Sequence, residues 1–573
     1  MNRLFLLSIF IILFSCRKVD NLESRHNTLN AVLRSEVSSI DPAKSYDTIS
    51  AQIVYQVHEA LYEYHFLKRP YSIQPLLAKS LPRISPDGLH YTIQLKKGIR
   101  FHHDKSFGNN PRYLVAQDLI NQIKRLAFKP LASNGWWLFD GKIKGLNDFR
   151  EKAKTINDLL SFPVQGLIAT DSHTLDIFLT KPFPQLVYAF AMSFTAPVPK
   201  ELILAYKNDF SEVAIGTGPF ILKKFHRSHI ISLVKNSNYR EVLYPSQGDR
   251  VANANGLLMD AGKRIPFLDK IKFTVMKESQ TRWLNFHKKK IDYLEIPKDN
   301  YSKAITESGG LSQEMKKKGI GLKISPSLTY WWNSFNMTDS LVGKNLYLRK
   351  AIAHSINTSR YIQLFTNNIG QRANSIYPPG IKGYNPADGL PYEYNIVLAR
   401  KYLAQAGFPE GKGLPEINYD VRGTTTKYRQ RGDFIKNELS KIGIKIKVTL
   451  NTFPAFLEKA RAGKLQFFGD GWAMDYPDAE NSLQILSKRS HPPGPNASFY
   501  HNPKFEEYYA ELSLLQDGPR KIELMRLMQN LVNKDLPWIM QYYERNYILL
   551  HSYLKNFRPD DLITNSIKYL RID

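Results

Sequence analysis

The segment from Ile417 to Asp478 constrains the fold most strongly, because the hydrophobic period of a strand and that of a helix alternate along it. Apolar and polar residues alternate over 417–421 as in a half-buried strand, and the apolar residues of 434–442 have helical spacing, with Gly443 placed to end the helix. The pattern continues with a strand over 444–450, a helix near 456–460 and a strand over 465–469. This order predicts a βαβαβ unit within an α/β protein.

Other parts of the chain carry the same two periods. Residues 91–95 alternate as a strand, and residues 348–356 have the spacing of an amphipathic helix. A chain of 573 residues ordinarily folds around several cores, which suggests two to four domains. A single cysteine allows no internal disulfide, so core packing must hold these domains together.

Two charged residues come after strands of the βαβαβ unit. Arg422 follows the first strand, and Asp475 lies in the loop after the third. Ligands of open α/β sheets bind beyond the carboxyl ends of the strands, so we expect both side chains to face one crevice. One cation and one anion there would suit a zwitterion such as a short peptide with free ends. A salt bridge made by either residue is the alternative.

The beginning of the chain has the pattern of a secretory signal. Arg3 precedes an apolar run over 4–14 that is too short for a stable membrane anchor, and Cys16, the only cysteine, follows. We therefore expect a signal peptide over 1–15 and a lipid-anchored linker over 16–28, because the site resembles a bacterial lipobox. Lipid on Cys16 would attach the exported chain to a membrane face. An ordinary signal peptide with an incidental cysteine is the alternative.

The net charge of +27 does not indicate nucleic acid as a partner. The basic residues are spread along the chain in brief clusters such as 288–290 and 316–318, without a zinc-ligand spacing, an RNP-like stretch or a long basic helix. We interpret them as solvated surface charge that favours an anionic membrane surface.

Catalytic and metal chemistry find little support in the sequence. The chain has no G-x-S-x-G motif, and its cysteine lies in the leader. His102, His103 and Asp104 are consecutive, and neighbouring residues of a strand point to opposite faces, so they chelate a metal poorly together. We expect no metal, no cofactor and no enzymatic activity.

Short motifs in a fixed order connect the chain to a known group of proteins. From about Leu29 to the C-terminus, the chain resembles the family 5 extracellular solute-binding proteins of ABC importers, the dipeptide- and oligopeptide-binding group. The motifs that carry the resemblance are Ser39–Pro42, Val57–Tyr62, Leu77–Ser80, Ser85–Gly88, Val115–Asp118, Gly216–Phe220, Leu348–Asn357, Tyr377–Gly380 and Ala399–Gly407.

The resemblance implies the type II periplasmic-binding-protein fold, an α/β architecture of two ligand-clasping lobes joined by a hinge, with an extra domain in the N-terminal half. Lobe I would comprise 29–70, 213–324 and 543–573. The extra domain would cover 71–212, and lobe II would cover 325–542. Ligand-driven closure of the lobes would follow, because the ligand contacts both of them only in the closed state.

The resemblance also assigns roles to individual residues. Asp475 would pair with the amino terminus of a peptide, Trp472 would line a side-chain pocket, and Arg422 would take the carboxylate of a dipeptide. Arg422 favours a short ligand, whereas the loop sequence DYPDAEN is closer to oligopeptide binders, so the ligand length stays open. Family members pair main chain with ligand at the positions of Tyr46, Asp47 and Thr48. Some members place a ligand-contacting residue at the position of Trp137, for which a place in the core is the alternative.

The sequence therefore predicts a monomeric lipoprotein of the periplasm or cell surface that captures di- or oligopeptides. It would deliver them to the permease and ATPase subunits of an importer. The alternative is the same fold with a non-peptide ligand, such as a nickel chelate, haem, a sugar or an opine. Asp475 argues for an amine-bearing ligand, because a buried carboxylate requires a charged partner.

Overall fold

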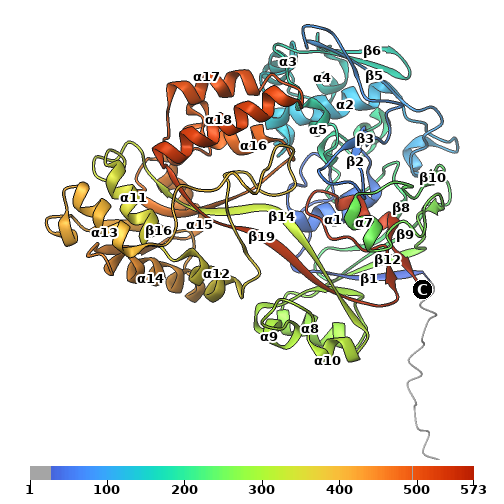
Figure 1. The fold of residues 1–573 in the computed structure, drawn as a ribbon. Helices are drawn as coiled ribbons and strands as arrows, with labels where there is room; N and C mark the ends of the chain where they lie inside the picture. The colour runs from blue at the N-terminus through green and yellow to red at the C-terminus, as the bar shows by residue number, and fades with distance from the viewer. Residues whose placement is uncertain (1–26, 493) are drawn as a thin grey trace, which may run out of the picture.

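Two long antiparallel strands, β14 (Ile320–Phe335) and β19 (Trp538–His551), run between the two ends of the molecule (Figure 1). The computed structural model describes residues 27–492 and 494–573. The predicted signal peptide, the predicted lipidation site Cys16 and nearly all of the predicted linker lie outside the described residues.

The pairing of β14 with β19 is irregular at two places near the middle, between Pro326 and Tyr330 and again between Trp331 and Trp332. The predicted lobe boundaries, 324/325 and 542/543, lie within these two strands and close to these irregularities. An irregular stretch in an otherwise continuous ladder bends and twists the strands locally. The division into lobes stays a prediction, and its boundaries coincide with a place where the ladder is weakened.

One end of the molecule contains a four-stranded sheet of order β1-β12-β9-β8, in which β1 and β12 are parallel and the other pairs are antiparallel. Helix α1 (Thr48–Val57) packs on it through Ile49, Ile53, Val54 and Val57, which join the apolar residues of β1 in one buried cluster. The strands are β1 (Thr28–Leu33), β8 (Phe220–His226), β9 (Ile230–Lys235) and β12 (Lys270–Val275).

A second, antiparallel sheet of order β4-β5-β7-β6 lies beside a group of short helices in the N-terminal half. The predicted strand over 91–95 is confirmed as β5, with Tyr91 and Ile93 buried. The elements of this part are β2 (Tyr62–Tyr64), β3 (Ile73–Pro75), β4 (Arg83–Ile84), β5 (His90–Gln94), β6 (Leu167–Asp171), β7 (Thr174–Phe178), α2 (Ala116–Ala127), α3 (Leu146–Lys152), α4 (Ile156–Ser161), α5 (Leu186–Ala189) and α6 (Lys200–Ala205).

The largest sheet has seven strands in the order β13-β19-β14-β18-β16-β17, with β15 paired to β19. The predicted βαβαβ unit is confirmed, because β16 is parallel to both β17 and β18. Gly443 has a φ of 89°, the left-handed conformation expected of a residue that ends a helix. The unit consists of β16 (Ile417–Val421), α14 (Thr426–Ser440), β17 (Ile446–Leu450), α15 (Phe453–Arg461) and β18 (Phe467–Ala473).

Helices surround the seven-stranded sheet and its edges (Figure 1). The predicted helix over 348–356 is confirmed as α11 (Leu346–Ser355). The remaining elements are β10 (Val242–Leu243), α7 (Arg250–Ala254), β11 (Arg264–Ile265), α8 (Ser279–His287), β13 (Tyr293–Glu295), α9 (Tyr301–Ala304), α10 (Gln313–Lys317), α12 (Thr358–Thr366), β15 (Gln371–Arg372), α13 (Ile396–Gln405), α16 (Ala479–Leu483), α17 (Pro503–Leu512), α18 (Pro519–Asp535), β20 (Leu554–Lys555) and β21 (Arg571–Ile572).

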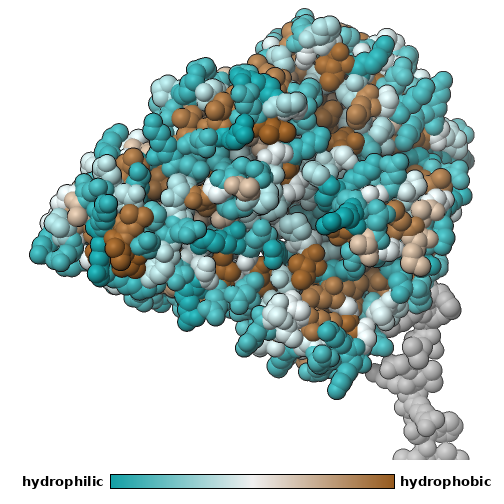
Figure 2. All heavy atoms as spheres, in the orientation of Figure 1, coloured by the Kyte–Doolittle hydropathy of each residue, from teal (hydrophilic) through white to brown (hydrophobic). Residues whose placement is uncertain are grey.

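Hydrophilic side chains cover most of the face drawn in Figure 2, and apolar side chains form smaller separate patches among them. Within the described residues, no helix has both the length and the apolar character needed to cross a bilayer.

Candidate ligand-binding site

An open groove of about 490 Å³ lies beside the N-terminus of α1. Its volume is within the range of roughly 300–1,000 Å³ that is typical of small-molecule sites. Two of the predicted ligand-binding residues, Tyr46 and Asp47, line it, and both are exposed. The other lining residues are Ser35, Glu36, Ser38, Lys44, Ile49 and Asn134.

The chain reaches this groove through a turn that is fixed on both sides. Asp47 is the N-cap of α1, and its carboxylate accepts hydrogen bonds from the backbone N–H groups of Ile49 and Ser50. From the opposite side, Asn134 Nδ2 donates to the carbonyl of Lys44 at 2.6 Å. The side chain of Tyr46 therefore projects from a backbone that is held in place.

Tyr46 contacts Asp475, the residue predicted to bind the amino terminus of a peptide. Its hydroxyl donates a hydrogen bond of 2.9 Å to Asp475 Oδ1, which joins residues 429 positions apart in the sequence. Asp475 Oδ2 accepts a hydrogen bond of 3.1 Å from Asn481 Nδ2. Asn481 Oδ1 in turn accepts one of 3.0 Å from the indole Nε1 of Trp472. The structure thus brings Tyr46, Trp472 and Asp475 into one network.

Asp475 is a partly buried carboxylate whose hydrogen bonds come from neutral groups. Among the residues that the structure describes, none of the basic side chains forms an ion pair with it. Burial raises the pKa of the Asp475 carboxyl above its ordinary value, although the hydrogen bonds from Asn481 and Tyr46 oppose the shift. A carboxylate in these surroundings gains most from a ligand that brings its own positive charge.

The same surroundings keep Tyr46 protonated. Although much of the side chain is exposed, partial desolvation of the phenol and the neighbouring carboxylate of Asp475 raise the pKa of Tyr46, so the hydroxyl acts as a hydrogen-bond donor at neutral pH. The ring of Tyr46 lies 5.6 Å from that of Phe194, which places an aromatic surface beside the carboxylate.

Arg422 follows β16 as predicted, but its partner is a different carboxylate. Arg422 Nη1 lies 2.7 Å from Asp470 Oδ1, and the guanidinium carbon lies 4.6 Å from the centroid of the Trp331 ring. Arg422 therefore forms a salt bridge of the kind that the sequence left open. Burial raises the pKa of Asp470, while Arg422 opposes that shift.

Thr48 and Trp137, the remaining predicted ligand-binding residues, lie in a helix and in a short 3-10 helix. Thr48 is the first residue of α1 and is exposed. Trp137 lies in a short 3-10 helix, η3 (Trp136–Leu138), and packs on the core cluster of the N-terminal half. Its indole Nε1 is buried, and none of the described residues accepts a hydrogen bond from it.

In the segment 102–104, the side chains of His102 and Asp104 form ordinary hydrogen bonds within the protein. His102 Nε2 lies 2.9 Å from the carbonyl of Gly218, and burial lowers the pKa of His102 to about 4. Asp104 caps the 3-10 helix η1 (Lys105–Phe107). In the described part of the chain, no group of three or more His, Cys, Asp and Glu residues is arranged to hold a metal ion.

Asn481 is a site residue that the sequence interpretation missed. It is fully buried and connects Trp472 with Asp475. A signal was available, since Asn481 ends the DYPDAEN stretch that begins at Asp475. Asn481 lies in the first turn of the helix that follows this loop, so its side chain can reach back to the carboxylate.

Comparison with known proteins settles the family. The family described as bacterial extracellular solute-binding proteins, family 5 Middle, matches residues 72–493, which is most of the chain. The chain belongs to this family. Its members are solute-binding proteins of ABC importers and act in the periplasm or outside the cell.

Relatives of this family 5 protein differ in the ligands for which they are named. The glutathione-binding protein GsiB of Escherichia coli K12 is 23% identical over 538 residues, which cover 91% of this chain and 89% of GsiB. The heme-binding protein A of Haemophilus influenzae is 24% identical over 518 residues, which cover 89% of this chain and 85% of that protein.

Solved structures confirm the predicted type II periplasmic-binding-protein fold. The DppA protein of Helicobacter pylori in complex with the peptide STSA has a TM-score of 0.70 and 25% identity, and the match covers 95% of this chain and 98% of DppA. HbpA2 of Haemophilus parasuis has a TM-score of 0.77 and 23% identity, with 96% and 100% of the two chains covered.

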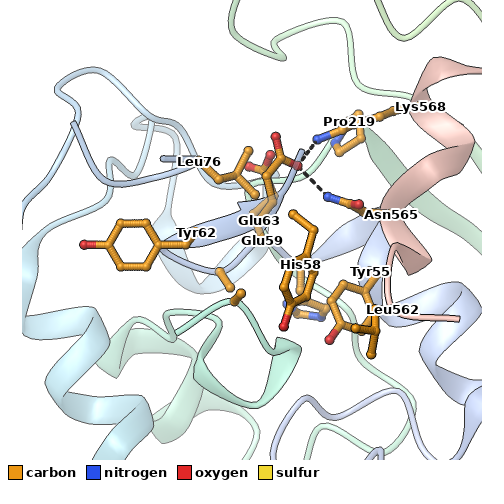
Figure 3. A pocket seen from close by; sticks show the side chains of 13 residues that line it. Tyr55, His58, Glu59, Tyr62, Glu63, Leu76, Pro219, Leu562, Asn565 and Lys568 are labelled. Carbon is orange, nitrogen blue, oxygen red and sulfur yellow. Dashed lines mark hydrogen bonds and ion pairs between the residues drawn. The ribbon is translucent and has the colours of Figure 1, made fainter. Parts of the chain in front are cut away.

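The family 5 protein also has a small cavity of about 20 Å³ near α1, which Figure 3 shows from close by. Glu63 accepts hydrogen bonds there from Lys568 Nζ and Asn565 Nδ2, both at 2.6 Å. A water needs roughly 10–15 Å³ of such space, so this cavity is large enough for one water and too small for a peptide. These contacts tie the C-terminal segment to β2.

His58, which lines the same cavity, is buried, and none of the described residues hydrogen-bonds either of its ring nitrogens. Burial lowers the pKa of His58 to about 3, so the imidazole is neutral at physiological pH. A neutral ring beside a cavity of this size suits a bound water. The open groove at Tyr46, whose hydroxyl contacts Asp475, remains the candidate ligand site.

Proposed function

We propose that this solute-binding protein captures short peptides, with Asp475 binding the α-ammonium group of the ligand. The proposal rests on the carboxylate of Asp475, which is partly buried and has no cationic partner among the described residues. This carboxylate lies in the loop after β18, where the loop contacts Tyr46. The groove beside Tyr46 provides the space for the rest of the ligand. Trp472 supplies an apolar ring next to the carboxylate, where a side chain of the peptide would pack.

The further steps of the proposal follow from the family. The loaded protein would dock on the permease and ATPase subunits of an ABC importer and release the peptide there. Asp47 would contact the ligand from the wall of the groove, Thr48 and Trp137 would contact it from outside that wall, and Arg422 would stand near the carboxyl end of a short ligand. Support comes from neighbours solved with peptides: DppA of Helicobacter pylori with STSA, and a dipeptide-binding protein of Pseudoalteromonas with Met-Leu.

Haem is the second candidate ligand, because one relative is named for it. The two candidates differ at Asp475, since haem carries no ammonium group that this carboxylate could neutralise. Calorimetry with di-, tri- and tetrapeptides, glutathione and haem tests the assignment. Binding of haem alone, unchanged in Asp475→Ala, would contradict the peptide assignment.

Closure of two lobes as a monomer is part of the proposal. The lobes would be 29–70 with 213–324 and 543–573, and 325–542, with 71–212 as the extra domain. The hinge would lie at the pairing irregularity of β14 and β19. Small-angle scattering during the peptide titration should give the mass of one chain and a smaller radius of gyration in the bound form. Binding without a change in the radius would contradict closure.

We also propose that Cys16 carries lipid and that the mature chain begins there. Its place directly after the apolar run 4–14 motivates this proposal. Labelling of producing cells with a fatty-acid analogue should mark the wild-type protein and leave Cys16→Ser unmarked. Equal labelling of both proteins would exclude a lipid anchor at this position and leave an ordinary export signal.

Peptide affinity is expected to fall on acidification at a pH above the usual titration range of aspartate. Burial raises the pKa of Asp475, and the ligand ammonium requires the ionised carboxylate. Binding should therefore be strong above this raised pKa and be lost as the pH falls through it. Calorimetry between about pH 7 and about pH 4 measures the effect, since unperturbed aspartate titrates near roughly 3.9. Asp475→Asn should bind weakly at every pH, and a constant wild-type affinity would contradict the prediction.

A further inference from the structure

A second cavity, of about 30 Å³, lies between α14 and the sheet at the end of β16. Glycine at 469 keeps this space open, since a Cβ there would lie 2.9 Å from the hydroxyl of Tyr419. Gly471 has a similar effect on the neighbouring ring, because a Cβ at that position would lie 2.6 Å from Trp331 Cε3. Two glycines on β18 thus make room on the face of the sheet that α14 covers.

The charged residues that line this cavity carry more positive than negative charge. They are Arg422, Arg431 and Asp470, and the one carboxylate is already paired with Arg422 at 2.7 Å. Arg431 is 8% exposed, and in the described part of the chain no carboxylate lies within ion-pair distance of it. Its oxygen contact is the hydroxyl of Tyr542, at 3.5 Å. A buried arginine without an anion is costly to maintain.

Aromatic rings surround this guanidinium without neutralising its charge. The guanidinium carbon lies 5.8 Å from the ring centroids of Tyr361 and Tyr428 and 6.0 Å from that of Trp331. Such contacts stabilise a cation only modestly, and by less than the cost of burying an unpaired charge. The rings hold Arg431 in place and leave its charge available.

The unsatisfied polar groups of the lining residues are hydrogen-bond donors. Arg431 Nε, Trp332 Nε1 and Gln541 Nε2 are buried, and the described residues supply no acceptor for any of them. Buried donors are normally paired, and each one left unpaired costs free energy. A group that satisfies them must be rich in acceptors, and an anion would also balance the charge of Arg431.

The size of the cavity limits which acceptor group could bind there. At roughly 10–15 Å³ for each water-sized group, about 30 Å³ accommodates two oxygen atoms, as in a carboxylate. We propose that this cavity is a carboxylate-binding compartment of the ligand site, in which Arg431 pairs with an acidic group of the ligand. This inference rests on the proposed peptide function and extends it to a specificity determinant.

The position of the cavity suits that role. Arg422 and Asp470, which form its wall, have side chains that are 21% and 19% exposed, so the wall is accessible to solvent. Asp470 lies on β18, five residues before Asp475 on the same stretch of chain. A ligand with its ammonium group at Asp475 would therefore extend along the end of β18 toward Arg431. The carboxylate can belong to the chain end of the peptide or to an acidic side chain.

Calorimetry with four probes separates these two sources: Ala-Ala-Ala, its carboxyl-terminal amide, and the amides of Ala-Glu-Ala and Ala-Gln-Ala. If the chain end enters the compartment, the free tripeptide should bind wild type roughly tenfold or more tightly than its amide. If a side chain enters, the Glu amide should exceed the Gln amide by a similar factor. In Arg431→Met, the difference should disappear.

Arg429→Met is the matched control, because Arg429 lies on the same helix and is exposed. It should retain the wild-type preference. The melting temperature of ligand-free Arg431→Met should equal or exceed that of wild type, because an apolar side chain replaces an unpaired buried charge. Arg431→Lys, which keeps the charge, should retain part of the preference for acidic peptides and serves as the second variant if Arg431→Met does not fold.

Three results would overturn the inference. Peptide binding by wild type with no preference for either carboxylate would leave the peptide function standing and exclude the compartment. An acid preference that survives in Arg431→Met would assign it to another residue. Binding of none of the four probes by wild type would contradict the peptide function itself and this inference with it.

Discussion

Replacement of Asp475 by alanine is expected to weaken peptide binding by roughly 30-fold or more, since truncating one partner of a desolvated charge pair typically costs about 2–5 kcal/mol. The wild-type carboxylate is partly buried and receives hydrogen bonds from Tyr46 and Asn481, so it is held in position before the ligand arrives. In the variant, the ligand ammonium would enter the same place and lose its counter-charge. Isothermal titration calorimetry with a di- to tetrapeptide series measures the loss.

Two controls make this result specific. N-acetylation of the peptide removes the ammonium charge, so it should weaken binding to wild type by a similar factor and add little to the defect of Asp475→Ala. Asp433→Ala removes an exposed carboxylate from α14 and should bind like wild type. Equal affinity of Asp475→Ala and wild type for free and acetylated peptides would exclude the peptide assignment.

Local periodicity predicted the βαβαβ unit because each of its elements buries one face. The apolar residues of β16 and β17 alternate, and those of α14 recur on the side that packs against the sheet, so the signal is contained in a few neighbouring residues. The order of the strands was not predictable in this way. β14 and β19 are separated by more than 200 residues, and no local pattern specifies that they pair.

The partner of Arg422 illustrates the same limit at the site. The sequence interpretation ended the third strand at 469 and singled out Asp475 in the loop beyond it, although Asp470 is the first acidic residue after that end. β18 instead continues to Ala473, and its parallel register places Asp420 opposite Phe468. Two residues farther along each strand, Arg422 and Asp470 are therefore neighbours. The interpretation passed over this pair because no local pattern gives the register between the two strands, whereas Asp475 does lie beyond the end of β18, as predicted.

The motif Ser39–Pro42 supported the resemblance, but the sequence did not show what the motif does in the fold. The structure shows its role through Asp41. Asp41 is fully buried and forms a salt bridge with the equally buried Arg125 of α2, with Arg125 Nη2 2.7 Å from Asp41 Oδ2. Arg125 Nη1 lies 3.2 Å from the other carboxylate oxygen, so the pair is bidentate. Asp41 Oδ1 also accepts a hydrogen bond from the backbone N–H of Ala43, at the start of the turn that leads to Tyr46.

Arg125→Met is therefore expected to destabilise the part of the protein that unfolds with α2 by about 3–5 kcal/mol, because it leaves the carboxylate of Asp41 buried without its cation. Asn208 and Gln122, whose side-chain oxygens accept hydrogen bonds from Arg125, would lose their donor as well. Urea denaturation followed by circular dichroism should show a lower midpoint. Arg526→Met, which changes an exposed arginine of α18, should stay within about 0.5 kcal/mol of wild type.

The double variant Asp41→Leu/Arg125→Met distinguishes the loss of a charge pair from a simple packing defect. Removal of both charges eliminates the unpaired carboxylate, so the double variant should be more stable than Arg125→Met alone. Its turn would still lack the hydrogen bond that the backbone N–H of Ala43 donates to Asp41, and the groove at Tyr46 would be less well held. We therefore expect recovery of stability with incomplete recovery of peptide affinity. A double variant no more stable than Arg125→Met would mean that Arg125 acts through the volume it fills, with its charge contributing little.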